Sequence, residues 1–284
     1  MQPWYITFYY NKVEFVGSTP ISGYPKPFSG SATYKNNKNN TYFNMPLEEE
    51  IVDAILHRYV TGEKVVLSFG TGPLSEKFVK KIAFRIETEG LNAKVVPTSA
   101  HIAGILSELN IPTTTLNESE IDLAIELVDL VDRHFNFIKR DSISLVRDKM
   151  IAQSAEELIV IAREKNYVKE LCGEIPFEVT PFGWKLTLTQ LEKFGEAVLR
   201  ATGAVPFRTE TNNYIVDVFI DEIFSLDELE TNAKNIPGVI ETGLFIGYAD
   251  RVLLHNGKIH AKSRMDYSKQ NVIEKPELRS PFTI

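Results

Sequence analysis

Apolar and polar positions alternate along the middle of the chain as they do where strands and helices follow one another in a parallel sheet. The segment KVVLSF (64–69) is a short apolar run typical of a buried strand, and the helical pattern SEKFVKKIAFRIETEG, which stops at Gly90, follows it. Further strands are predicted at AKVVPTS (93–99), IDLAIEL (121–127) and ELIVIA (157–162), with a helix at AHIAGILSELN (100–110). This order predicts a Rossmann-like parallel sheet with helices on its faces.

A different pattern begins near residue 174. Three further strands are predicted there, with one long helix between the first two and a second helix before the third. The strands are IPFEVTPF (175–182), NYIVDVFID (213–221) and VIETGLFI (239–246), and the helices are LTLTQLEKFGEAVLRATG (186–203) and SLDELETNAKNIPG (225–238). This βαβαβ order predicts a small α+β domain of the split-βαβ, ferredoxin-like type. YADRVLLHNGKI (248–259) is one more predicted strand, which we expect to return to the first sheet.

These patterns divide the chain into four parts. Residues 1–44 are rich in aromatic and β-forming residues and predict a β-rich N-terminal extension of two or three short strands. Residues 45–173 form the Rossmann-like domain, which opens with a helical pattern after Pro46, and residues 174–249 form the small α+β domain. Residues 250–284 supply the return strand and a C-terminal arm, whose polar, proline-containing end predicts no regular structure.

Composition narrows the class of protein. The chain has 284 residues, 43% of them hydrophobic, and a formal net charge of −7 with its lysines and arginines scattered, which argues against nucleic acid as a partner. Cys172 is the only cysteine, so a disulfide within the chain is excluded and a reducing compartment is favoured. No apolar run reaches the roughly 18 residues of a membrane helix, and the N-terminus has no signal-peptide pattern. We therefore expect a cytoplasmic protein without a membrane partner.

Several motifs occur in a fixed order along these predicted elements. They are Gly70-Thr71-Gly72 after the first strand, Pro97-Thr98-Ser99, the acidic run from Asp122 to Asp129, the segment from Ile138 to Lys149, and Ile236 to Phe245. In this order, from about Met45 to Ile259, the chain resembles ribose-5-phosphate isomerase of the A type. The run IPGVIETGLF (236–245) is the most specific match. The resemblance implies that residues 45–173 bind a sugar phosphate.

The chemistry that the resemblance implies has definite requirements. Interconversion of an aldose and a ketose phosphate needs a carboxylate to move a proton between C1 and C2, donors for the enediolate oxygen, and an anion site for the phosphate. It needs no cofactor and no metal, and the five histidines show no metal-ligand spacing. The catalytic residues that the resemblance implies are Asp148, Lys139, Asp129 and Glu126. It implies as phosphate-binding residues Gly70, Thr71, Gly72, Thr98 and Ser99. It also implies a homo-oligomer, either a dimer or a tetramer.

The chain departs from the family pattern at several of these positions. Asp148 stands where the family has a glutamate, and Glu126 stands where it has an aspartate. The segment 140–142 (Arg-Asp-Ser) replaces a run of glycines after the catalytic lysine, and Pro73-Leu74 replaces a Ser-Thr pair after the glycine turn. Near the first helix, Glu49-Glu50 stands where family members often carry a lysine. Asp148 is one methylene shorter than glutamate, and a displacement of about 1 Å can cost on the order of 100-fold in rate.

Plainer interpretations stay open for the same residues. Residues 142–155 are also typical of a capped amphipathic helix with Ile143, Val146, Met150 and Ile151 inward, in which case Asp148 faces solvent. Thr98 and Ser99 are also typical of a helix cap alone. Two hypotheses follow. The first is a divergent ribose-5-phosphate isomerase of the pentose phosphate pathway. The second is a non-catalytic relative, a sugar-phosphate sensor or structural subunit, that docks to itself or to another protein through residues 1–44.

Overall fold

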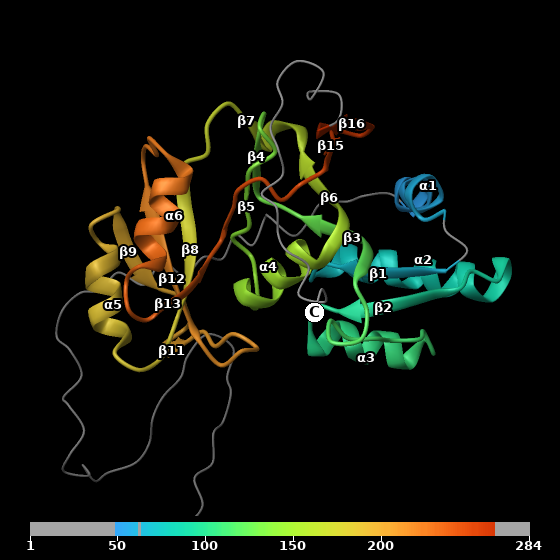
Figure 1. Cartoon of the computed structure of the whole chain (residues 1–284), viewed down its shortest axis with the longest axis horizontal. Coiled ribbons are helices and arrows are strands. Elements are labelled where there is room, and N and C mark those ends of the chain that lie inside the picture. The colour runs from blue at the N-terminus through green and yellow to red at the C-terminus, as the bar shows by residue number, and fades with distance from the viewer. Residues whose placement is uncertain (1–48, 62–63, 265–284) are drawn as a thin grey trace, which may run out of the picture. The chain divides into compact units, whose positions relative to one another are not determined.

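The computed structural model describes residues 49–61 and 64–264, and its elements are shown in Figure 1. The largest sheet has six strands in the order β16-β15-β6-β3-β1-β2, all parallel except β16, which runs antiparallel to β15. The strands are β1 (Val65–Phe69), β2 (Ala93–Pro97), β3 (Ile121–Leu127), β6 (Ala155–Arg163), β15 (Arg251–His255) and β16 (Ile259–Ser263). The predicted α/β fold with a parallel sheet is confirmed. The extension predicted for residues 1–44 and the arm from residue 265 onward lie outside the described residues.

Helices cover both faces of this sheet. Side chains of α1 (Glu49–Tyr59), α2 (Pro73–Glu89) and α3 (Ala100–Glu108) share one hydrophobic cluster, whereas α4 (Leu145–Ser154) belongs to a second. Neighbouring residues of a strand face opposite sides, so these clusters lie on opposite faces of the sheet. Helix α2 ends at Gly90, which has the left-handed φ of 70° expected of a helix C-cap. Within the described ranges no helix is long and apolar enough to cross a membrane.

A second, antiparallel sheet has the strand order β13-β8-β12-β9 and a hydrophobic core of its own. In Figure 1, α5 and α6 lie beside these strands. The elements are β8 (Gly173–Val179), α5 (Trp184–Leu191), β9 (Glu196–Leu199), β12 (Tyr214–Ile220), α6 (Leu226–Lys234) and β13 (Val239–Thr242). A short hairpin of β10 (Ala201–Thr202) and β11 (Val205–Pro206) lies between β9 and β12. The order β-α-β-β-α-β is that of a ferredoxin-like unit.

The single long helix predicted over residues 186–203 is wrong. Helix α5 ends at Leu191, and Glu196–Leu199 forms the edge strand β9, which pairs with β12. Gly195 marks the change, because a Cβ there would lie 1.9 Å from the Phe219 carbonyl oxygen. The strand needs a glycine at this close approach, and the hydrogen bonds to β12 override the local helical pattern.

A third, small sheet was not predicted, and it places the candidate site. Its strands β14 (Leu244–Phe245), β5 (Phe137–Ile138), β4 (Leu130–Asp132) and β7 (Tyr167–Val168) are neighbours in that order, and the 3₁₀ turn Glu164–Asn166 precedes β7. β4 begins directly after Asp129, and β5 ends directly before Lys139. The sheet thereby fixes the backbone on either side of two predicted catalytic residues.

Candidate active site

Lys139 lies between two carboxylates that come from different elements. Its Nζ is 2.6 Å from Glu126 Oε2 on β3 and 2.8 Å from Asp148 Oδ2 on α4. All three residues are buried, with at most 3% of any of them exposed. Three of the four residues predicted as catalytic are therefore brought together, and a buried ammonium between two carboxylates is the central feature of the site.

Helix α4 presents Asp148 to the interior. Ser144 caps the helix by accepting a hydrogen bond from the Arg147 N–H, and the Ser142 hydroxyl donates to Asp148 Oδ2 at 2.6 Å. The buried residues of the helix are Leu145, Asp148, Lys149, Ile151 and Ala152. The interpretation in which Asp148 faces solvent is therefore wrong.

The predicted inward face of this helix was partly wrong as well. Ile151 is buried, but Met150 is 52% exposed, and Ile143 and Val146 are only half-buried. The hydrophobic pattern gave the wrong face because two charged residues, Asp148 and Lys149, occupy buried positions. Each of them has ion-pair partners, buried Lys139 for Asp148 and half-buried Glu241 for Lys149, which a pattern of apolar positions does not reveal.

Burial and the charges of Lys139, Glu126 and Asp148 shift the pKa values of Glu126 and Lys139. Burial raises the pKa of Glu126 to about 7; the Lys139 ammonium opposes this shift, and the Asp148 carboxylate adds to it. Burial alone would lower the pKa of Lys139, but Asp148 and Glu126 raise it above its ordinary value. Lys139 therefore stays charged, and Glu126 is the carboxyl that exchanges a proton near neutral pH.

The glycine turn between β1 and α2 lies against this cluster. The Gly70 N–H donates to the Ile125 carbonyl at 3.0 Å, and a Cβ on Gly70 would lie 2.3 Å from Glu126 Oε2. Gly70 thus allows the Glu126 carboxylate to approach the turn. Gly72, with φ 102°, is the N-cap of α2, whose first residue is Pro73, and Thr71 is buried. The turn that leads into the N-terminus of α2 therefore contacts the Glu126 carboxylate at Gly70.

Thr98 and Ser99 are engaged in structural hydrogen bonds. The Thr98 hydroxyl donates to the Phe69 carbonyl at 2.9 Å, and the Ser99 hydroxyl caps α3 by accepting from the Ile102 N–H at 3.0 Å. The Ala100 N–H donates to the Glu210 carboxylate, at 3.0 and 3.1 Å from its two oxygens. The capping interpretation holds for Ser99, and a phosphate role for either hydroxyl stays a prediction.

Asp129 holds the loop that follows Lys139. Its Oδ2 accepts from the Arg140 N–H at 2.6 Å, and burial raises its pKa even though neighbouring N–H groups and cations oppose the shift. The Arg140 guanidinium donates to the Glu174 carbonyl at 2.8 Å, so it is directed toward the start of β8. Burial raises the pKa of Asp141 to about 6.

Two residues that sequence reasoning missed support Lys139 and Asp148. Besides Ser142, Gly243 lies behind the lysine: its carbonyl accepts from the Lys139 N–H at 2.9 Å. A Cβ on Gly243 would lie 2.7 Å from the Lys139 carbonyl and 2.5 Å from Pro176 Cγ. Gly243 lies within the run IPGVIETGLF, but its contact with Lys139 depends on the pairing of β5 with β14.

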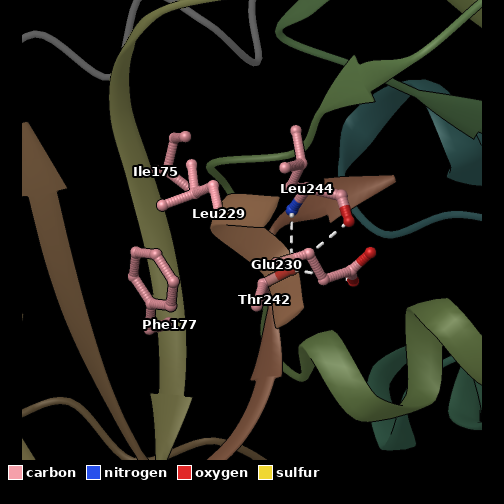
Figure 2. Close-up of a pocket in the computed structure, with 6 residues that line it drawn as sticks. All are labelled: Ile175, Phe177, Leu229, Glu230, Thr242 and Leu244. Carbon is pink, nitrogen blue, oxygen red and sulfur yellow. Dashed lines mark hydrogen bonds between the residues drawn. The ribbon is translucent and has the colours of Figure 1, made fainter. Parts of the chain in front are cut away.

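Away from this cluster, the described residues include a hollow but no group of side chains suited to a metal ion. A hollow beside β8, drawn in Figure 2, is lined by Ile175, Phe177, Leu229, Glu230, Thr242 and Leu244. It belongs to the core of the second sheet and contains none of the cluster residues. Across the described ranges, no group of three or more histidine, cysteine, aspartate or glutamate side chains is arranged to hold a metal ion.

Comparison with known proteins assigns the chain that carries this site to a family. The family model of ribose 5-phosphate isomerase A (phosphoriboisomerase A) matches residues 94–258. The chain is 37% identical over 201 residues to ribose-5-phosphate isomerase A of Cereibacter sphaeroides, covering 67% of this chain and 80% of that protein. The chain belongs to the ribose-5-phosphate isomerase A family. A second family member, ribose-5-phosphate isomerase A 2 of Oceanobacillus iheyensis, is 36% identical over 206 residues, covering 71% of this chain and 92% of that protein.

Solved structures of the family share the fold. The ribose 5-phosphate isomerase of Plasmodium falciparum superposes with a TM-score of 0.71 at 28% identity, covering 76% of this chain and 97% of that one. The family member from Methanocaldococcus jannaschii gives a TM-score of 0.68 at 29% identity, with 76% and 95% covered. A third, a D-ribose-5-phosphate isomerase in complex with phospho-erythronic acid, gives a TM-score of 0.70 at 28% identity, with 76% and 97% covered. The superposition with this chain covers nearly the whole length of each of these family structures.

Proposed function

We propose that the chain is an isomerase that interconverts ribose 5-phosphate and ribulose 5-phosphate by enediolate proton transfer. Asp148 takes the proton from C2 of the open-chain aldose and returns it to C1, while a second proton moves from O2 to O1. Lys139, with Asp129, orients the sugar hydroxyls and stabilises the charge that develops on the enediolate oxygen. The turn Gly70–Gly72, with Thr98 and Ser99, holds the phosphate.

The observation that carries this proposal is the pair of carboxylates on Lys139. A buried ammonium 2.6 and 2.8 Å from two carboxylates supplies, in one place, a base and a cation for the developing negative charge. A purely structural role does not require this arrangement, because an uncompensated second carboxylate raises the energy of the buried cluster. The Gly70 turn adjoins Glu126, which supports its proposed role in holding the phosphate of the same substrate.

The replacement of a family glycine by Arg140 is compatible with the proposed activity. Arg140 replaces a family glycine, but its guanidinium donates to the carbonyls of Glu174 and Cys172. The side chain is thereby held away from Lys139, and its backbone N–H still reaches Asp129. The altered phosphate turn, where Pro73 supplies no N–H, leads us to expect weaker phosphate binding, with a raised KM.

Turnover of ribose 5-phosphate tests the proposal directly. The purified protein is incubated with ribose 5-phosphate, and ribulose 5-phosphate is measured. We expect turnover that falls at least about 1,000-fold in Asp148→Asn, because the amide cannot accept the proton. Asp221→Asn, at an exposed position, is the matched control and retains wild-type activity.

Binding separates the two sequence-based hypotheses if turnover is absent. Phospho-erythronic acid, which a solved family member binds, serves as the probe in calorimetry. Binding without turnover would favour a sugar-phosphate sensor, and absence of both would favour a structural role. A cytoplasmic location, a homo-oligomer and a protein partner for residues 1–44 stay predictions.

A further inference from the structure

Three consecutive charged residues of α4 point to three different parts of the molecule. Asp148 reaches Lys139, Arg147 pairs with Glu210 in the loop before β12, and Lys149 reaches α6 and β13. Successive residues of an α-helix are about 100° apart around its axis, so the three contacts fix the helix from three sides. Only the contact of Asp148 is used by the proposed chemistry. Of the other two residues, Lys149 is buried, whereas the Arg147 side chain is 41% exposed.

Lys149 is buried in a carboxylate pocket of its own. With 4% of the residue exposed, its Nζ lies 2.5 Å from Glu230 Oε1, 2.8 Å from Glu241 Oε1 and 3.2 Å from Thr242 Oγ1, above the Phe245 ring at 5.2 Å from its centroid. Burial would raise the pKa of Glu241, but the Lys149 ammonium holds it below its ordinary value. The ammonium therefore has fixed partners.

The partners of Lys149 are themselves anchored in the second sheet. Figure 2 shows Glu230 and Thr242 side by side at the hollow next to β8, with Thr242 joined to Glu230 and to Leu244 by hydrogen bonds, each 3.3 Å long. Buried Ile175 and Phe177 line the same hollow. The ammonium of Lys149 is thus tied to the packed core of the second sheet, whereas Asp148, the preceding residue of the helix, faces the cluster at the first sheet.

We propose that Lys149 is a positioning residue that sets the rotation of α4 and thereby holds the Asp148 carboxylate in register with Lys139. This inference rests on the proposed function and deepens it. A rotation of α4 that relaxes Lys149 carries Asp148 with it, because both side chains project from one rigid turn. A displacement of about 1 Å at a reacting group is enough to lower turnover on the order of 100-fold.

The chain contains a matched control for this lysine. Lys234 binds the other oxygen of Glu241, Oε2, at 3.0 Å, but its side chain is 43% exposed and it lies on α6. Lys149→Met and Lys234→Met therefore each remove one positive charge from the same carboxylate, the first from α4 and the second from α6. We expect kcat to fall about 30- to 100-fold in Lys149→Met with KM changed less than about 3-fold. In Lys234→Met both constants stay within about 2-fold of wild type.

Loss of the buried ammonium also removes the cation from Glu230 and leaves Glu241 with Lys234 alone, so stability needs a separate test. The triple variant Lys149→Met, Glu230→Gln, Glu241→Gln removes that charge imbalance. We expect its Tm to return toward the wild-type value while kcat stays low. Amide hydrogen exchange over residues 145–154 is the readout independent of turnover, and we expect faster exchange in Lys149→Met than in Lys234→Met.

The outcomes separate this inference from the function on which it rests. Wild-type protein without turnover contradicts the proposed function, and exchange over α4 then still reports whether Lys149 holds the helix. Active wild type with normal kcat in Lys149→Met overturns the inference. Recovery of kcat together with Tm in the triple variant also overturns it, because Lys149 would then contribute to stability alone.

Discussion

Lys139 can neutralise only one of the two carboxylates that it contacts, and their lengths are exchanged relative to the family pattern. Glu126 is one methylene longer than the family aspartate, and Asp148 is one methylene shorter than the family glutamate. Both still reach Nζ, at 2.6 and 2.8 Å. We therefore expect the lengthening on β3 to compensate for the shortening on α4.

Exchanging the two lengths tests this compensation at the level of single residues. Glu126→Asp leaves a gap beside Lys139, and Asp148→Glu overfills a packed site, so we expect each to lower kcat/KM about 10- to 100-fold. The double variant restores the family pattern, and we expect it to recover to within about 5-fold of wild type, since contacting residues are energetically coupled. Losses that simply add in the double variant would contradict the compensation.

The backbone of Lys139 depends on the pairing of β5 with β14. Gly243, next to β14, lies where a Cβ would meet the Lys139 carbonyl at 2.7 Å and the Pro176 ring at 2.5 Å. We expect Gly243→Ala to displace β5, to lower stability by about 1–3 kcal/mol, as for overpacked sites, and to lower turnover at least about 10-fold. Urea unfolding and initial rates measure the two effects.

Gly104 within α3 is the control for this substitution, because a Cβ there meets nothing within 4 Å. Gly104→Ala is expected to stabilise the protein by about 0.5–1 kcal/mol through the better helix propensity of alanine, with turnover unchanged. Equal effects of the two substitutions would contradict a specific role for Gly243.

Elements with a clear period and caps could be predicted from the sequence, and elements fixed by distant pairing could not. Helix α2 has both a period and the terminal Gly90, so its end was predicted correctly. The segment 186–203 has a helical period as well, but β9 forms there because β12 offers it hydrogen bonds. β5, with two residues, carries no usable period. The single strand predicted over 239–246 is wrong, because it divides into β13 and β14, and β14 pairs with β5 in another sheet. Such short strands exist only through their partners.

The candidate site shows the same division at the scale of the whole molecule. The order of the family motifs in the sequence indicated Glu126, Lys139 and Asp148, and the structure brings these three residues together. Lys149 and Gly243, like Ser142, were missed as supporting residues. Lys149 joins α4 to the second sheet, and the contact of Gly243 with Lys139 depends on the pairing of β5 with β14 in the third sheet. Only the assembled molecule shows that the helix carrying Asp148 is also tied to the second sheet, through Lys149.

Folding stability should depend on pH through the charge imbalance of the buried cluster. The pKa of Glu126 is raised from 4.5 to about 7, mainly by burial, with the ammonium of Lys139 and the carboxylate of Asp148 as its charged neighbours. Between these two values the folded state binds more protons than the unfolded state. The free energy of unfolding therefore falls as pH rises from about 4.5 to about 7 and is level above that range with respect to this group. At 1.36 kcal/mol per pKa unit, the loss is about 3 kcal/mol at most.

Glu126→Gln isolates this contribution, because the amide mimics the protonated carboxyl and leaves Lys139 paired with Asp148. We expect the variant to match wild type near pH 5 and to be more stable than wild type at pH 8, although it loses a buried ion pair. Urea unfolding followed by circular dichroism at pH 5, 6, 7 and 8 measures the difference. Asp141 has a raised pKa too, so some decline should persist in the variant. An equal decline in both proteins would show that Glu126 is already ionised at pH 5, and that Lys139 compensates both carboxylates.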